Sequence, residues 1–213
     1  LGDVYKRQTL NRSSPGSTSG AGTTWNKLVG GACIGAIKTN GELWTWGYNA
    51  SGQLGYSSTV DRSSPGTVAG QGTTWSQVSS AVGTTTGTIA ITGAVKTDGT
   101  LWMWGNNAAG GLGTNNTTNR SSPVTVSGGG TTWAQVSVGV GNATELGFAG
   151  AIKTDGSMWT WGSNDQGQLG DGTTTSRSSP GTVSGGGTTW SSVAALGGIY
   201  ADGFCGVKTD GSL

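Results

Sequence analysis

The acidic residues are the first candidates for chemistry in this chain, because it contains no histidine. Histidine is the usual general base near neutral pH and the commonest metal ligand, so both roles would fall to other side chains. Asp98, Asp155 and Asp210 each precede a glycine in the tripeptide Thr-Asp-Gly, a typical turn sequence. We interpret these three aspartates as turn residues, and we expect a protein that is not an enzyme and holds no cofactor and no metal.

Two other pairs of residues could carry chemistry. Asp165 and Asp171 could offer oxygen ligands to Ca²⁺, but their spacing matches no recognised cation-binding loop. Cys33 and Cys205 stand at different distances from the lysine that follows each of them, so they are not equivalent positions of a repeat. We interpret them as small buried residues rather than as a disulfide.

The basic residues recur with the same regularity as the aspartates. They could form a basic arc, or the arginines could hold loops and stack on indoles while the lysines solubilise hairpins. With a net charge of +1 and 10% charged residues, the chain has no field strong enough to hold a nucleic acid or an anionic membrane. Eight of the eleven basic residues belong to the two repeated sets, Arg12, Arg62, Arg120 and Arg177, and Lys38, Lys96, Lys153 and Lys208.

Tryptophan is the most regularly placed residue type. In each Trp-x-Trp pair the two indoles point to one face of a strand, and that face must be covered. Exposed indoles could bind a glycan, but the regular spacing favours a structural role, because burying one indole stabilises the fold by roughly 4–6 kcal/mol at most. The ten structural candidates are Trp25, Trp44, Trp46, Trp75, Trp102, Trp104, Trp133, Trp159, Trp161 and Trp190.

These residues sit in a repeat that begins anew about every 57 residues. Arg-Ser-Ser-Pro starts at Arg12, Arg62, Arg120 and Arg177, so successive copies are 50, 58 and 57 residues apart. A period of this size is typical of solenoids and propellers, whose units cannot bury their own apolar faces alone. The length of a unit and its glycine-rich turns favour four antiparallel strands, the blade of a β-propeller.

One complete unit shows where the strands should lie. We expect them near residues 75–79, 90–96, 100–105 and 123–127. The second and third are joined by Thr-Asp-Gly, because Asp-Gly tolerates the positive φ angles of a tight hairpin. The fold class is therefore all-β, with blades of four antiparallel strands in an incomplete, open arc.

Length varies in only one part of the repeat, the stretch between the first and second strands. From the Thr-Thr-Trp tryptophan to the hairpin lysine the chain counts 13, 21, 20 and 18 residues in the four copies. In a four-strand meander this stretch shares a rim with the long third connection, such as residues 106–119, and loops of tolerated length on a rigid scaffold are where binding usually sits. The candidate contacts are Ser80, Val82, Thr84, Thr85, Thr86, Thr88, Val140, Asn142, Thr144 and Glu145.

Three motifs carry a resemblance to a known family. They are Trp-Thr-Trp-Gly-Tyr-Asn-Ala-Ser-Gly-Gln-Leu-Gly at residues 44–55, Trp-Gly-Ser-Asn-Asp-Gln-Gly-Gln-Leu-Gly-Asp-Gly at 161–172, and Pro-Gly-Thr-Val at 65–68. Over about residues 9–213 the chain resembles the regulator of chromosome condensation repeat family. The resemblance implies a seven-bladed propeller in the complete protein, of which about three and a half units are present.

The resemblance also implies a range of functions. Members of this family act mainly as protein-binding scaffolds, and they include a nucleotide exchange factor for a small nuclear GTPase, so the fold does not choose the function. We expect residues 1–8 to be a non-native or unstructured leader and 9–213 to be one repeat domain. Its expected role is recognition of a protein, or else of a glycan, through the variable-loop rim. The alternative is nucleotide exchange or chromatin-associated regulation, and we also expect self-association through open blade faces.

Overall fold

The computed structural model describes residues 24–30, 33–70, 72–83, 89–141, 146–197 and 202–213, and this part of the chain contains strands and turns only. The expected leader, residues 1–8, lies outside the described residues. The strands are β1 (Trp25–Val29), β2 (Cys33–Lys38), β3 (Leu43–Gly47), β4 (Arg62–Thr67), β5 (Trp75–Val82), β6 (Ala90–Lys96), β7 (Leu101–Gly105), β8 (Arg120–Thr125), β9 (Trp133–Val140), β10 (Gly147–Lys153), β11 (Met158–Gly162), β12 (Arg177–Thr182), β13 (Trp190–Leu196) and β14 (Gly203–Lys208).

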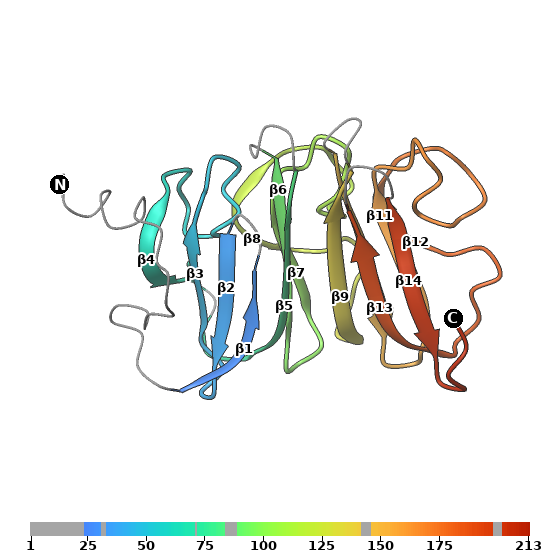
Figure 1. The fold of residues 1–213 in the computed structure, drawn as a ribbon, viewed down its shortest axis with the longest axis horizontal. Helices are drawn as coiled ribbons and strands as arrows, with labels where there is room; N and C mark the ends of the chain where they lie inside the picture. Colours follow the sequence, from blue (N-terminus) through green and yellow to red (C-terminus); the bar gives the residue numbers. More distant parts are fainter. Residues whose placement is uncertain (1–23, 31–32, 71, 84–88, 142–145, 198–201) are drawn as a thin grey trace, which may run out of the picture.

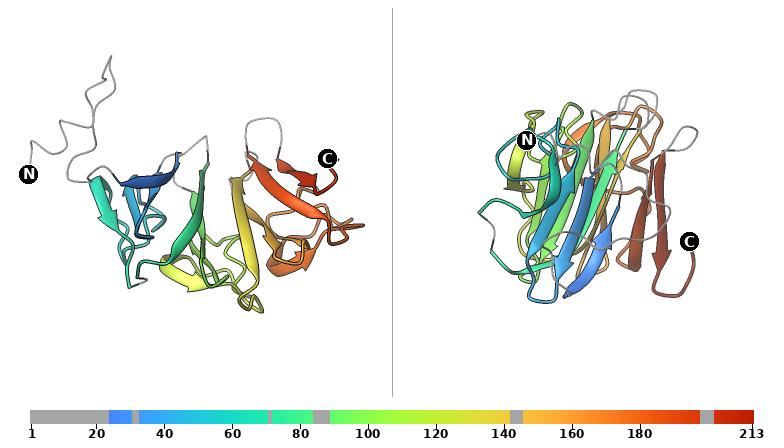
Figure 2. Two further views of the ribbon diagram at one scale, coloured as in Figure 1. Left: turned by 90° about the horizontal axis from the view of Figure 1, so that it is seen from below. Right: turned by 60° about the vertical axis from the view of Figure 1, so that its left-hand side comes forward.

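The strands form three four-stranded antiparallel sheets and one two-stranded sheet, each made of consecutive strands. We call β1–β4, β5–β8 and β9–β12 blades 1, 2 and 3, and β13–β14 the half-blade. Successive sheets stand side by side in an open arc (Figures 1 and 2). The expected all-β propeller blades are confirmed.

Two strand boundaries differ from the sequence-based expectation. The first strand of blade 2 continues past residue 79 to Val82, because Ser80, Ala81 and Val82 still pair with β6. The fourth strand begins at Arg120 rather than near residue 123, so Arg-Ser-Ser-Pro starts this strand instead of preceding it. Both differences come from pairing with a neighbouring strand, which the local sequence does not reveal.

The Thr-Asp-Gly hairpin also differs in detail. Only Gly99 has a positive φ, of 79°, whereas Asp98 does not enter the left-handed region. The Asp98 carboxylate instead accepts hydrogen bonds from the backbone N–H and the hydroxyl of Thr100, at 2.9 and 2.7 Å. The turn is thus a three-residue loop that ends in a left-handed glycine, and the aspartate closes it through its side chain.

The indoles of blades 2 and 3 pack against the preceding blade, as the spacing predicts. In blade 2 the ring of Trp75 lies 6.5 Å from that of Trp102 and 6.1 Å from that of Trp104. Trp75 and Trp104 are 3% and 0% exposed, and they pack with Ile37, Leu43 and Val68 of blade 1. The same packing recurs where Trp133 and Trp161 of blade 3 meet blade 2. Of the ten tryptophans, five are buried and five half-buried, so none presents the bare platform that glycan stacking would need.

The first strands of neighbouring blades are joined by glutamine side chains. Gln77 donates from Nε2 to the carbonyl of Val136 at 2.8 Å, and its Oε1 accepts from the Val136 N–H at 2.7 Å. Gln135 makes the same pair of bonds with Val193, at 3.3 and 3.0 Å. Each side-chain amide therefore makes the two hydrogen bonds that a backbone amide would make between neighbouring strands, and so links two separate sheets.

Candidate recognition surface

The long third connections and the ends of the variable loops lie on the same rim, at the top of Figure 1. The N–H of Asn106, which opens the long loop of blade 2, donates to the carbonyl of Ala90 at the start of β6, at 2.8 Å. In blade 3 Ser163 makes the equivalent bond to Gly147 at 3.1 Å. These bonds place both kinds of loop beside each other, as a four-strand meander requires.

Each long loop is organised around one buried asparagine. Asn107 is 1% exposed, and its Nδ2 donates to the carbonyls of Asn116 at 2.9 Å and Thr118 at 3.1 Å. Its Oδ1 accepts from the N–H of Leu112 at 2.9 Å, and Leu112 is itself fully buried. Asn49 and Asn164 make the same set of contacts in blades 1 and 3. A buried amide that satisfies both strands of a loop fixes its path.

The first two long loops are also held by the next blade. The N–H of Ser57 donates to the carbonyl of Ser121 in β8 at 2.8 Å, and that of Asn115 to Ser178 in β12 at 2.7 Å. Ser57 and Asn115 are the two non-glycine residues with positive φ in the described chain, at 64° and 59°. Such a backbone is costly for a residue with a side chain, and the bonds to the neighbouring blade help to hold it.

Above these fixed bases the loop tips are exposed and polar. We define the long-loop rim as residues 56–61, 114–119 and 171–176. Residues 115–119 and 172–176 are all exposed, and they offer mostly Asn, Ser and Thr side chains. Val60, with 62% of its surface exposed, adds one apolar contact. Hydroxyl and amide groups on a rigid support suit recognition by hydrogen bonds rather than by charge.

The predicted contact residues fall into two groups. Ser80 and Val82 lie within β5, and Val140 ends β9 with 3% of its surface exposed, so these three belong to the sheets and not to the loops. The Ser80 hydroxyl lies 2.7 Å from the Cys33 thiol of blade 1, and this contact joins β5 to β2. The remaining candidates, Thr84, Thr85, Thr86, Thr88, Asn142, Thr144 and Glu145, lie outside the described residues.

The arginines take two different positions. The guanidinium of Arg62 covers Gly66 of its own strand and lies 4.8 Å from the ring of Tyr56, and Arg177 covers Gly181 in the same way. Arg177 also lies 3.6 Å from Asp171. In blade 2 a valine replaces this glycine, and Arg120 is exposed. Arg62 and Arg177 therefore brace their long loops from the outer strand, which agrees with the loop-holding interpretation rather than with stacking on indoles, whereas Arg12 lies outside the described residues.

The lysines lie on the opposite rim and stack on indoles. The Nζ of Lys38 is 4.0 Å from the Trp44 ring, and that of Lys153 is 4.2 Å from the Trp159 ring. Lys96 takes the equivalent place over Trp102, and Lys208 lies over Trp190, which is the counterpart of Trp75. The lysines thus cover tryptophan rings as well as solubilising the hairpins, and they do not converge into a basic arc.

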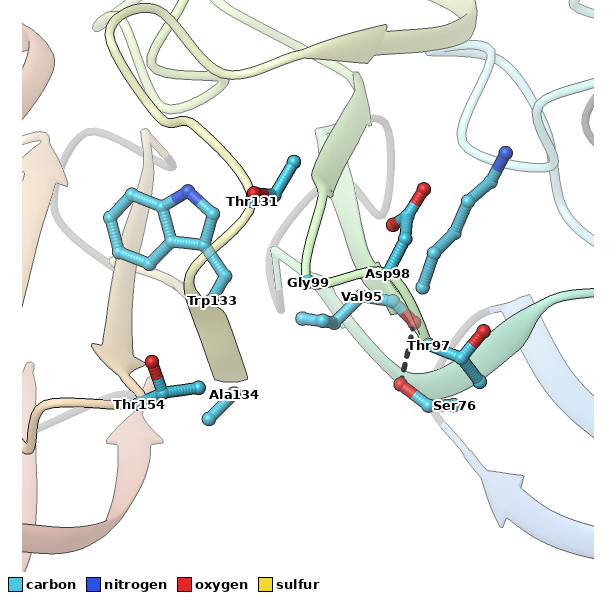
Figure 3. Close-up of a pocket in the computed structure, with 10 residues that line it drawn as sticks. Ser76, Val95, Thr97, Asp98, Gly99, Thr131, Trp133, Ala134 and Thr154 are labelled. Atoms are coloured by element: carbon cyan, nitrogen blue, oxygen red, sulfur yellow. Dashed lines mark hydrogen bonds between the residues drawn. The ribbon is translucent and has the colours of Figure 1, made fainter.

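The hairpins of this rim also join successive blades. The carbonyls of Gly41, Gly99 and Gly156 accept from the backbone N–H groups of Trp75, Trp133 and Trp190, at 2.9 to 3.0 Å. Between blades 2 and 3 these contacts leave a cavity of about 350 Å³. Figure 3 shows Thr97 and Asp98 on one side of it and Trp133 and Thr154 on the other.

The carboxylates have the environment of turn residues. The Thr100 hydroxyl, followed by its backbone N–H, lowers the pKa of Asp98 below its ordinary value. The Ser157 hydroxyl lowers the pKa of Asp155 in the same way. For Asp210 the backbone N–H of Ser212 is the largest cause of the lowered pKa. A depressed pKa suits a structural acceptor rather than a proton-transfer group at neutral pH.

The two cysteines differ in exposure, and the loop carboxylates are held by hydrogen bonds. Both thiols are free; Cys33 is buried, and burial raises its pKa, whereas Cys205 is exposed, contrary to the expectation of a small buried residue. Asp171 is bonded to Thr173 and Asn164, and Asp165 to Ser163. No group of three or more metal-ligating side chains occurs in this part of the chain. It likewise contains no helix with the length and apolarity to cross a membrane.

The residues that build the loops and join the blades were not among those predicted from the sequence. Asn49, Asn107 and Asn164 recur two residues after the glycine of Trp-x-Trp-Gly, at the same spacing as the tryptophans. That spacing was a signal for a structural role. Gln77 and Gln135 recur two residues after the Thr-Thr-Trp tryptophan, but blade 1 has Lys27 at this place and the half-blade has Ser192, which obscures the pattern.

Known structures share this architecture. Prp20p from Saccharomyces cerevisiae superimposes with a TM-score of 0.65 at 17% identity, over 87% of this chain and 44% of that chain. A structure of Kap60 bound to yeast RCC1 (Prp20) gives a TM-score of 0.65 at 16% identity, over 87% of this chain and 42% of that chain. At these identities the likeness shows the fold alone.

Sequence comparison identifies the family. The E3 ubiquitin-protein ligase HERC2 of Homo sapiens is 30% identical over 141 residues, which is 64% of this chain and 3% of HERC2, and HERC2 of Mus musculus matches equally. The regulator of chromosome condensation (RCC1) repeat matches residues 40–86, 98–143 and 155–198, well over half of the chain. With these matches and the repeated four-stranded blades, the chain belongs to the RCC1 repeat family.

Proposed function

We propose that this chain is a non-enzymatic recognition module that binds a protein through the long-loop rim. The observation that carries the proposal is the contrast within each loop. A buried asparagine fixes the base of all three loops, and a bond to the next blade adds to it in the first two, while the tips expose mostly Asn, Ser and Thr side chains. A surface that is ordered before binding loses less conformational entropy when a partner docks.

The relatives support a protein as the partner. Prp20p was characterised for its binding to Gsp1p and histones, and yeast RCC1 was captured with Kap60. Because the present chain spans less than half of these proteins, their particular partners do not transfer to it. We carry over only the class of ligand, a protein, and the polar loop tips fit a protein partner.

The charge of the chain distinguishes protein recognition by the long-loop rim from the alternative, chromatin-associated regulation or nucleotide exchange. Binding to histone-bearing chromatin depends on charge and weakens steeply with salt. The long-loop rim carries Asp61 and Asp171, and the arginines that directly follow its three segments are Arg62, Arg120 and Arg177, so the two signs of charge are nearly balanced there. We therefore expect binding that changes little between low and physiological salt, and we expect no nucleotide exchange.

Photo-cross-linking from both rims tests the proposal. Benzoylphenylalanine is placed at Thr117 or Thr174 on the long-loop rim, and at the equally exposed Thr97 or Thr154 on the hairpin rim as matched controls. Each variant is irradiated in yeast extract, and adducts are identified by mass spectrometry and competed with unlabelled chain. We expect discrete, competed adducts from Thr117 and Thr174 only. Adducts confined to Thr97 and Thr154, or none at all, would contradict the proposal.

A second assay addresses the alternative function. A small nuclear GTPase loaded with a fluorescent GDP analogue is mixed with this chain, and an exchange factor for that GTPase serves as the positive control. We expect nucleotide release at the uncatalysed rate. Acceleration that is lost when residues 115–118 are replaced would favour exchange activity instead.

We further infer that copies of the chain associate through their open blade faces. Leu28 lies three residues after Trp25, as Val78, Val136 and Val193 follow their tryptophans, but it is 69% exposed where they are 4%, 1% and 5% exposed. At the other end of the arc Leu196 is 48% exposed. Apolar side chains on two different faces favour head-to-tail contacts.

A further inference from the structure

Arg120 cannot pack onto its own strand in the way that its counterparts in the other two blades do. In blade 1 the guanidinium of Arg62 covers Gly66, where an added Cβ would lie only 2.0 Å from the Arg62 Cζ. Arg177 covers its glycine at the same distance. Blade 2 has Val124 at this place, and the valine side chain fills the space that the guanidinium would need. Arg120 is accordingly exposed, whereas Arg62 and Arg177 are half-buried.

The long loop of blade 2 does not hold Arg120 either. Six residues before its arginine, blade 1 has Tyr56, whose ring lies 4.8 Å from that guanidinium, and blade 3 has Asp171, whose carboxylate lies 3.6 Å from it. Blade 2 has Thr114 there, whose hydroxyl donates to the Oδ1 of Asn116 at 3.3 Å. Among the described residues, no hydrogen bond, ion pair or ring contact holds the Arg120 guanidinium. Two substitutions thus release the same side chain.

The long loop of blade 2 also carries no acidic residue that could neutralise Arg120. Residues 106–119 contain neither Asp nor Glu, whereas the corresponding loops of blades 1 and 3 contain one and two aspartates. At the place of the blade 1 aspartate stands Asn119, whose Oδ1 accepts from the backbone N–H of Asn107 at 2.7 Å. The Nδ2 of Asn119 adds uncharged N–H donors one residue away from Arg120. The positive charge is therefore uncompensated within its own loop.

Arg120 lies where the first two long loops meet. The N–H of Ser57, in the tip of the first loop, donates to the carbonyl of Ser121 at 2.8 Å, and the hydroxyls of Ser57 and Ser122 lie 3.2 Å apart. Asn107 fixes the base of the second loop from within. An exposed guanidinium is thus attached to ordered backbone beside two polar loop tips. Little further ordering of the backbone is needed when a partner docks there.

Building on the protein-binding role of the long-loop rim proposed above, we propose that Arg120 selects partners that present a carboxylate, an Asp or Glu side chain, beside the first two loop tips. A guanidinium binds a carboxylate through two parallel hydrogen bonds, and arginine is enriched among the residues that dominate binding energy at interfaces. A nucleic acid is not the occupant, because one released arginine on a chain of net charge +1 cannot hold a polyanion. A single ion pair also keeps the salt dependence of binding small.

The release of Arg120 can be tested without any partner. Phenylglyoxal, which modifies accessible guanidinium groups, is added to the whole chain, and the modified arginines are located by mass spectrometry. We expect Arg120 to react several-fold faster than Arg62 and Arg177. The double variant Thr114→Asp, Val124→Gly, which gives blade 2 the residues of blade 3, should remove that difference. Equal rates in the unaltered chain, or an unchanged rate of Arg120 in the double variant, would overturn the inference.

A phage-displayed library of random linear peptides serves as the binding probe. Peptides are selected on the unaltered chain, and those weakened by Thr117→Trp, which blocks the tip of the second loop, are kept as rim binders. We expect them to be enriched in Asp and Glu, and Arg120→Gln to weaken their binding at least about tenfold. Lys153→Gln removes the same charge from the opposite rim and is the matched control, which should leave their binding unchanged.

A double-mutant cycle ties the arginine to the peptide carboxylate. Replacing the acidic residue of a selected peptide by its amide should weaken binding as much as Arg120→Gln does, and both changes together should weaken it little more than either alone. Rim binders without acidic enrichment, or losses that simply multiply, would overturn the role of Arg120 and leave the recognition role standing. Failure to select any rim binder would count against both.

Discussion

At the scale of single residues, buried amides define this protein more than its charges do. Asn49, Asn107 and Asn164 are at most 1% exposed, and each holds a loop of more than ten residues by bonding backbone groups on both of its arms. A buried polar group is expensive unless all its partners are present. The loop tips can therefore vary while these positions cannot.

Asn107→Ala should destabilise the chain by about 1–3 kcal/mol, because the buried N–H of Leu112 loses its acceptor. Urea unfolding followed by tryptophan fluorescence measures the change. Thr117→Ala in the same loop is the control, since Thr117 is exposed, and it should change the free energy of unfolding by less than about 0.5 kcal/mol. Similar losses for both variants would show that the asparagine does not organise the loop.

A second prediction at this scale concerns pH. Thr100→Val should raise the pKa of Asp98 towards its ordinary value, because the Thr100 hydroxyl is the largest cause of its depression, and leave that of Asp155 unchanged. A carboxyl with a depressed pKa adds stability above its unfolded pKa of about 3.9 and loses it as the pH falls through the folded pKa. The stability lost in the variant should thus be larger at pH 7 than at pH 2. Carbon-detected NMR titration of both aspartates checks the shifts, and an unmoved Asp98 would contradict the assignment.

At the scale of elements, each blade is a copy of one sheet, but its links to neighbours vary from copy to copy. Gln77 and Gln135 each clamp the next inner strand with two bonds. Lys27, at the same place in blade 1, reaches only the carbonyl of Ser76, at 2.7 Å. A lysine has donors and no acceptor, so it cannot complete the pair.

Exchanging these residues should change stability in opposite directions. Gln77→Lys leaves the Val136 N–H without its acceptor and should cost about 1–3 kcal/mol, while Lys27→Gln gains an acceptor towards blade 2 and should add about 0.5–1.5 kcal/mol. Chemical denaturation of the two single variants checks both signs. Loss of stability in Lys27→Gln would mean that the first strands of blades 1 and 2 are not separated like those of blades 2 and 3.

Much of the strand arrangement could be predicted from the sequence. The recurrence of tryptophan and Thr-Asp-Gly predicted four-stranded blades with indoles between them, because hydrophobic periodicity and turn residues act locally. The extension of β5 to Val82 could not be predicted, since it depends on pairing with residues 90–92. Nor could the buried state of Asn107, since an asparagine before a glycine-rich loop looks like any turn residue.

At the scale of the whole molecule, the arc presents different faces at its two ends. Leu28 marks one face, and Leu196 lies at the other end, where it ends β13 of the half-blade. Each face is the one that a neighbouring blade covers elsewhere in the chain. The same geometry underlies the expected self-association.

Light scattering during gel filtration should show oligomers whose mass rises with concentration. Leu28→Lys places a charge on the open face and should shift the chain towards monomer. Val60→Lys is the matched control, because Val60 is 62% exposed but lies on a loop tip away from the blade faces, and it should leave the mass unchanged. A compact monomer of the unaltered chain at high concentration would refute the association.

The bonds made by the hairpin glycines suggest an order in which the blades dock during synthesis. Gly41, Gly99 and Gly156 offer their carbonyls to tryptophans that come more than thirty residues later. A ribosome releases the polypeptide from its N-terminus, so each acceptor hairpin leaves the exit tunnel before the tryptophan that docks on it. Each blade can then dock on the blade made before it, and folding of the repeat does not depend on a segment far away in the sequence.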